Sequence, residues 1–115
     1  MARQKVVLQP PITLSAAATQ SGIDAVKVGN NRTGVVFADV YAYGGTTYNV
    51  LIETLSEDAN TTGQFTWIQV ASIAITSAAS VKVAITDLGE VVRWRVASMT
   101  GTNTFKLIVF FSDQN

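Results

Sequence analysis

The sequence contains no cysteine and no histidine. Without cysteine there is neither disulfide nor thiolate chemistry, and without histidine the usual general base and the commonest zinc ligand are missing. The first apolar run, residues 6–8, is shorter than the about 7–15 residues of a signal peptide's hydrophobic core. No run approaches the roughly 20 residues that a membrane helix needs. We therefore expect a chain without a membrane segment that is made in a cytoplasm.

Charge is also scarce in this chain. Eight basic and eight acidic residues cancel and make up 14% of the 115 residues, whereas soluble domains usually carry about a quarter. This balance leaves no basic surface for nucleic acid or for an anionic membrane. The length suits a single domain. The low charge predicts that other subunits cover part of the surface of this domain.

The acidic residues form no catalytic or metal-binding pattern. Only Asp39 lies within an apolar strand, where burial would raise its carboxyl pKa, and no second carboxylate is near it in the sequence. Glu57, Asp58 and Asn60 offer oxygen ligands to a hard cation, but such a loop is usually a solvated turn. We therefore predict no catalytic residue, no metal, no cofactor and no enzymatic activity.

The dominant period of the sequence is two residues, which is typical of β-strands. The pattern predicts an all-β fold, an antiparallel β-sandwich or jelly roll. Two hairpins are expected, one at the paired glycines Gly44 and Gly45 and one at residues 87–89, because these residues suit tight turns. The expected strands cover residues 4–9, 12–18, 23–28, 34–43, 47–55, 64–76, 80–86, 90–98 and 103–112.

Two predicted strands, residues 35–43 and 105–111, are apolar on both faces. In a lone antiparallel sandwich the outward face should be polar. A second cover is therefore expected, from the N-terminal segment, from a neighbouring subunit or from both. Shielding by loops of the same chain is the alternative.

Residues 1–11 are predicted to form an extended N-terminal arm ahead of a single β-sandwich domain at residues 12–115. The two prolines fix an extended backbone and remove two amide donors. An extended segment gains most by adding a strand to a neighbour's sheet edge. The candidate interaction residues of the arm are Arg3, Lys5, Pro10 and Pro11.

A second group of candidate residues surrounds a tryptophan. Trp94 shares a face with two valines and is predicted to fill the core, and the core is also the expected place of Trp67. Arg93 and Arg95 then point to the other face. They are suited to bind acidic groups of a neighbouring subunit, because guanidinium pairs bidentately with carboxylates. Pairing within the chain, with an acid such as Glu53, is the alternative.

Three tyrosines near the paired glycines suggest another kind of site. Sugar-binding sandwiches present exposed aromatic rings as stacking platforms, and Tyr41, Tyr43 and Tyr48 are close together in the sequence. A carbohydrate-binding or host-adhesion module is therefore an alternative function, with a glycan as its partner. The simpler interpretation is that these tyrosines are ordinary strand residues.

The second half of the chain resembles a family. A polar loop at residues 56–63 leads into a tryptophan strand at 64–68, an arginine–tryptophan strand follows at 90–95, and a Thr-Gly-Thr turn lies at 100–102. Over residues 51–112 this order resembles small β-sandwich virion proteins of tailed phages, of the capsid decoration or head-surface type. The resemblance implies a structural protein, commonly a trimer, with no enzymatic activity.

The preferred function from the sequence is therefore a capsid decoration protein that stabilises a phage head. The expected partners are copies of itself and the major capsid protein or other virion proteins, with no nucleic acid and no membrane. The expected location is the virion, after assembly in the host cytoplasm. A tail- or portal-associated virion protein is a further alternative.

Overall fold

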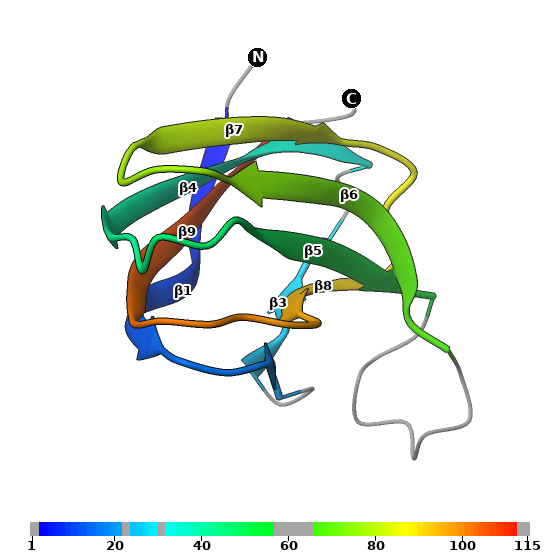
Figure 1. The fold of residues 1–115 in the computed structure, drawn as a ribbon. Helices are drawn as coiled ribbons and strands as arrows, with labels where there is room; N and C mark the ends of the chain where they lie inside the picture. Colours follow the sequence, from blue (N-terminus) through cyan, green and yellow to red (C-terminus); the bar gives the residue numbers. More distant parts are fainter. Residues whose placement is uncertain (1–2, 22–23, 30–31, 57–65, 113–115) are drawn as a thin grey trace.

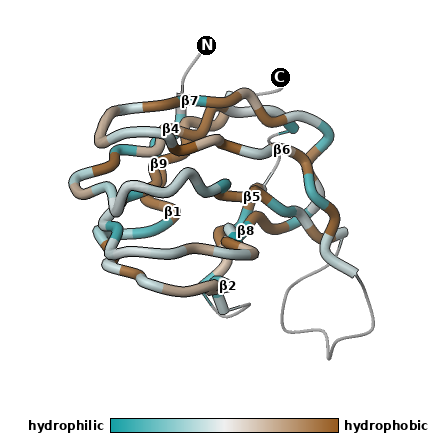
Figure 2. The backbone as a smooth tube through the Cα atoms, in the orientation of Figure 1, coloured by the Kyte–Doolittle hydropathy of each residue, from teal (hydrophilic) through white to brown (hydrophobic). Residues whose placement is uncertain are grey.

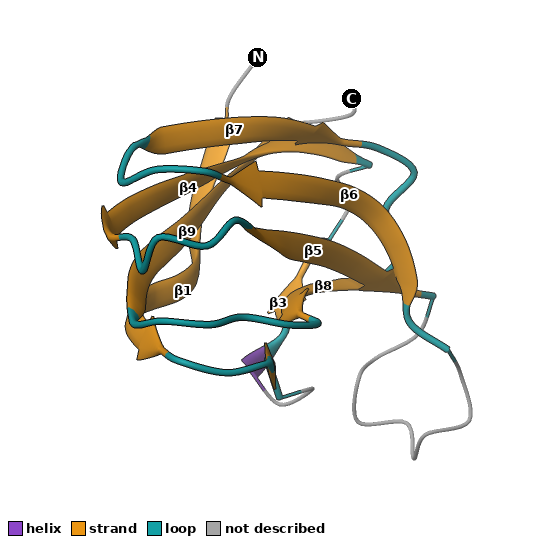
Figure 3. Ribbon diagram, viewed as in Figure 1, coloured by secondary structure: helices purple, strands orange, loops and turns teal. Residues whose placement is uncertain are grey.

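A computed structural model describes residues 3–21, 24–29, 32–56 and 66–112. Strands account for most of this part of the chain (Figure 3), and no helix in it is long and apolar enough to cross a membrane. The strands are β1 (Arg3–Leu14), β2 (Ala18–Thr19), β3 (Val26–Lys27), β4 (Thr33–Ala42), β5 (Tyr48–Leu55), β6 (Ile68–Ile75), β7 (Ser80–Ile85), β8 (Val91–Val96) and β9 (Asn103–Ser112).

The strands form two antiparallel sheets that pack face to face (Figure 1). Sheet A has the order β1-β9-β4-β7, and sheet B has the order β2-β8-β5-β6, with β3 also paired to β8. This architecture confirms the predicted all-β antiparallel sandwich. The strand positions also agree with the period-two pattern, since the strands expected at residues 34–43, 47–55 and 103–112 are present almost unchanged.

The core lies between the sheets and is filled by alternate residues of each strand. In β9, residues at odd positions are buried and residues at even positions are partly exposed. The same alternation runs along β4. Hydrophobic residues occur in the strands of both sheets (Figure 2). The largest fully buried side chains include Phe105, Phe111, Leu8, Ile52, Ile73, Ile75, Ile85 and Leu107.

The hairpin predicted at Gly44 and Gly45 is wrong. β4 pairs with β7 and β9, and β5 pairs with β6 and β8, so the glycines connect the two sheets. Gly44 is needed because the connection packs on the loop before β9. A Cβ atom on Gly44 would lie 2.9 Å from the Cα atom of Gly101, and the Gly44 N–H donates to Asn103 Oδ1 over 2.8 Å.

The second predicted hairpin, at residues 87–89, is also wrong. β7 belongs to sheet A and β8 to sheet B, so these residues again cross between the sheets. Asp87 has a positive φ of 55°, and the next residue, Leu88, is buried. The Gly89 N–H donates to Thr54 Oγ1, and the Glu90 N–H donates to a carbonyl at the end of β5. The turn is therefore anchored on the sandwich by its own backbone.

The separate arm predicted over residues 1–11 is corrected by the structure. The segment is extended, as expected, but it belongs to β1, which pairs with β9 of its own chain from Arg3 to Leu14. The register shifts on both sides of Gln9, so the ladder passes Pro10 and Pro11, which have no amide donor. An edge strand tolerates such prolines. The expected boundary at residue 12 therefore falls inside a strand.

Candidate functional site

The outer face of sheet A is apolar at its centre. Val7, Ile108 and Phe37 lie side by side on β1, β9 and β4. Phe110 and Val35 form the next row, and the rings of Phe37 and Phe110 meet edge to face with centroids 5.6 Å apart. These side chains are partly exposed, and Val7 is 48% exposed. Both faces of β4 and β9 are thus apolar, as the alternation of the sequence indicates.

Val7 was not among the predicted interaction residues. It stands opposite Ile108 because β1 completes the sheet. Nothing in the sequence around Val7 indicates that its strand pairs with β9. The sequence does show that β4 and β9 are apolar on both faces. This pattern predicts an apolar outer face on these two strands, but not that the face extends onto β1.

Charged side chains surround the apolar centre of this face. The Lys106 ammonium lies 3.6 Å from Asp39 Oδ2, and the Ser80 hydroxyl donates to Asp39 Oδ1 over 2.7 Å. A hydrogen bond with Tyr41 and the nearby Asp39 carboxylate raise the pKa of Lys106. Asp39 is therefore a partly exposed carboxylate on the sheet surface, and it is not the buried acid that the sequence left open.

The predicted residues of the N-terminal segment lie along β1. Lys5 is exposed and stands opposite Phe110 on the outer face of sheet A. Pro10 and Pro11 are exposed at the irregular part of the strand, and Arg3 pairs with the last residue of β9. These four residues are therefore spread along one edge of the sheet and do not form a cluster.

The three tyrosines do not form a common platform. Tyr41 is 55% exposed on the outer face of sheet A. Tyr43 is half-buried, with its hydroxyl 3.4 Å from Thr47 Oγ1. Tyr48 is buried, its hydroxyl has no hydrogen-bond partner among the described residues, and burial raises its pKa to about 12. Only one of the three rings is thus open to a ligand.

Arg93 and Arg95 meet on the outer face of sheet B. Arg93 Nε donates to Glu53 Oε1 over 2.9 Å, and Arg95 Nε donates to Glu53 Oε2 over 3.0 Å. The register of β5 and β8 brings the three residues together. The pairing within the chain, which the sequence offered as an alternative, is therefore present. Trp94 faces the opposite way and fills the core, as predicted.

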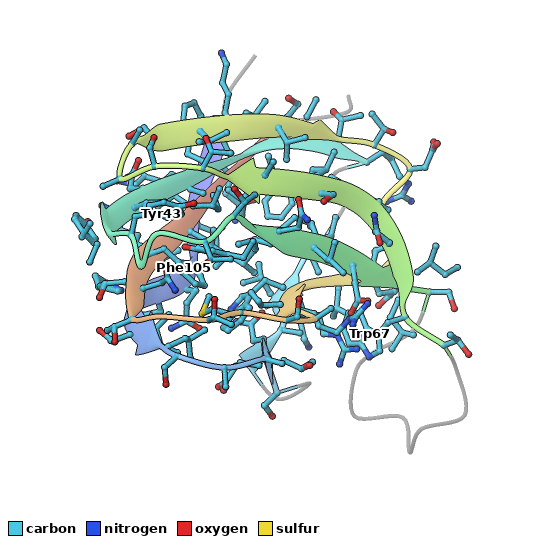
Figure 4. The ribbon with its side chains drawn as sticks, viewed as in Figure 1. Tyr43, Trp67 and Phe105 are labelled. Atoms are coloured by element: carbon cyan, nitrogen blue, oxygen red, sulfur yellow. The ribbon has the colours of Figure 1, made fainter. Side chains whose placement is uncertain are left out.

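Trp67 is not a core residue, so this prediction is wrong. It lies just before β6, it is half-buried, and its ring is 4.2 Å from the Cζ atom of Arg93. Figure 4 shows Trp67 far from Tyr43 and from the core ring of Phe105. Its indole therefore stacks on the arginine cluster and adds an aromatic wall to it.

The described residues contain no group of three or more acidic, cysteine or histidine side chains that are placed to hold a metal ion. A polar hollow of about 300 Å³ lies at one end of the sandwich and is lined by Gly29, Arg32, Ser56, Leu88, Gly89 and Glu90. It holds one arginine and one glutamate. The predicted loop at Glu57, Asp58 and Asn60 lies outside the described residues.

The sequence matches no protein-family model and no curated protein. Two solved structures are similar in fold. One is from the Bacillus endospore appendages described as a family of disulfide-linked pili, with a TM-score of 0.57, 15% identity, and coverage of 98% of this chain and 88% of that chain. The other is the SPBc2 prophage-derived protein YomS, with a TM-score of 0.53, 14% identity, and coverage of 95% and 93%. At such low identity, the likeness establishes a shared sandwich fold over almost the whole chain.

Proposed function

We propose that this chain is a non-catalytic structural subunit of a phage-type particle, and that it acts as a capsid decoration protein that binds copies of itself. The observation that carries the proposal is the apolar centre of the outer face of sheet A. A sandwich that works alone presents polar side chains there. Each Å² of apolar surface removed from water contributes about 25 cal/mol, so burial of this face contributes favourably to a contact between subunits.

The fold comparisons support this class of function. One similar structure is a prophage-derived protein, and another comes from a pilus. The pili are described as disulfide-linked, whereas this chain contains no cysteine. Its assembly would therefore rest on non-covalent contacts such as the apolar face. We propose the assembled virion as its location, and the major capsid protein as its second partner.

The proposal is tested by Ile108→Lys. Ile108 lies at the centre of the outer face and not in the core, so a lysine there should disrupt the contact and leave the domain folded. Light scattering after size exclusion in about 1 M NaCl, which screens charged contacts, should show an oligomer for the unmodified chain and a monomer for this variant. The matched control is Ile68→Lys, because Ile68 is 63% exposed on sheet B, and it should stay oligomeric. Equal masses for the two variants would exclude the outer face of sheet A as the contact.

A further inference from the structure

Within the described part of the chain, the arginine cluster on sheet B carries more positive charge than its acidic partner neutralises. Arg93 and Arg95 share the single carboxylate of Glu53, so the cluster carries one more positive than negative charge. Both hydrogen bonds to Glu53 use Nε. Neither guanidinium donates from Nη to any residue in the described ranges.

The chemistry of this cluster fits a further carboxylate. The Glu53 side chain is only 6% exposed, so its two ion pairs hold both arginines in place. The Trp67 ring stacks on Arg93 and restrains it further. A guanidinium that is held in this way loses little conformational entropy on binding, and its Nη groups match the two oxygens of a carboxylate.

The described residues also include exposed carboxylates that have no partner among them. Asp87 and Glu90 are exposed on the turn between β7 and β8, and neither side chain has a hydrogen bond or ion pair within the described part of the chain. The turn between them is anchored, since Leu88 is buried and the Gly89 N–H binds Thr54 Oγ1 over 2.8 Å. Its two acids are thus displayed on a fixed backbone.

We infer that the Arg93–Arg95 cluster of one copy binds the acidic turn at Asp87 and Glu90 of a second copy. The two surfaces complement each other in charge, and each has hydrogen-bonding capacity that the described residues leave unused. This inference rests on the proposed self-assembly but concerns a different surface. Because the two sides of the contact differ, two copies can pair reciprocally about a two-fold axis, or the contact can repeat head-to-tail into a ring or an open chain. The contact is also electrostatic, whereas the contact through sheet A is apolar.

The salt concentration distinguishes the electrostatic contact from the apolar contact, because salt screens only the charged one. In about 10 mM NaCl the screening length is roughly 30 Å, and in about 1 M it is roughly 3 Å. Sedimentation velocity of the unmodified chain should therefore show a larger assembly at low salt than at high salt. The double variant Asp87→Asn, Glu90→Gln should lose this increase and keep the high-salt species. Asparagine tolerates the positive φ at position 87.

Arg95→Gln should give the same loss, because it removes the excess charge and leaves the Arg93–Glu53 pair. A mixture of Arg95→Gln with the acid-neutralised variant should regain part of the low-salt assembly, since each supplies one intact side of the contact. Asp24→Asn neutralises another exposed acid and should change nothing. Thermal melting of each variant confirms that it is folded.

Two results would overturn the inference. One is an assembly whose size does not change with salt, which would leave the apolar contact of sheet A intact. The other is a salt-dependent step that survives the loss of both turn acids. The Ile108→Lys variant distinguishes a failure of this inference from a failure of the proposed function, because it removes the apolar contact of sheet A and retains the arginine cluster and the turn.

Discussion

Removal of residues 1–11 is expected to unfold the domain. The deletion takes away most of β1 and its ladder with β9. It also removes Leu8, which is 2% exposed in the core, and whose loss alone would cost about 2–5 kcal/mol. Two further bonds disappear, from Trp94 Nε1 to Gln9 Oε1 and from Gln20 Nε2 to the Leu8 carbonyl. Since small domains are stable by only about 5–15 kcal/mol, the sum should abolish cooperative folding.

Circular dichroism during heating measures this directly. The control is Lys5→Gln, which changes an exposed side chain of the same strand and should melt close to the unmodified chain. A truncated chain that still melts cooperatively near the normal temperature would restore the interpretation of residues 1–11 as an arm. Loss of the transition would identify the segment as an integral strand.

Trp94→Ala is expected to lower the free energy of unfolding by about 3–5 kcal/mol, as truncations of large buried aromatics do. Trp94 is 2% exposed, and its ring meets Phe105 edge to face with centroids 5.6 Å apart. The variant also leaves Gln9 Oε1 without its donor. The loss should appear as a lower urea midpoint with an unchanged slope.

Trp67→Ala and Tyr43→Ala are the controls for this measurement. Both residues are half-buried, so both should cost clearly less than Trp94→Ala. Equal, small losses at Trp94 and Tyr43 would show that the inward and outward faces of β8 have been assigned incorrectly.

The fold class and most strand positions were predictable, because alternation is a local property. It placed Trp94 inside and Arg93 outside from their neighbours alone. Strand pairing is not local in this fold. Gly44 and Gly45 suit a hairpin turn, yet each flanking strand finds its partners elsewhere in the chain. The glycines are required by the close approach of Gly101, which lies far away in the sequence.

For the candidate surfaces too, the features set by local alternation were predictable and those set by strand pairing were not. The apolar outer face could be predicted from β4 and β9, whereas the contribution of Val7 depends on the pairing of β1 with β9. The arginines were recognised, but the pairing of β5 with β8 decides that both bind Glu53. Residues 87–89 were recognised as a turn, but the anchoring of this turn on Thr54 of β5 could not be predicted, because it depends on how the strands pair.

The most direct test of the central claim is the mass of the unmodified chain in solution. Sedimentation equilibrium at micromolar concentration in about 1 M NaCl screens the electrostatic contacts and leaves the apolar face of sheet A to act alone. Self-assembly through this face predicts a mass that is a multiple of the 12.3 kDa of one chain. A folded, cooperatively melting species of 12.3 kDa under these conditions would contradict it.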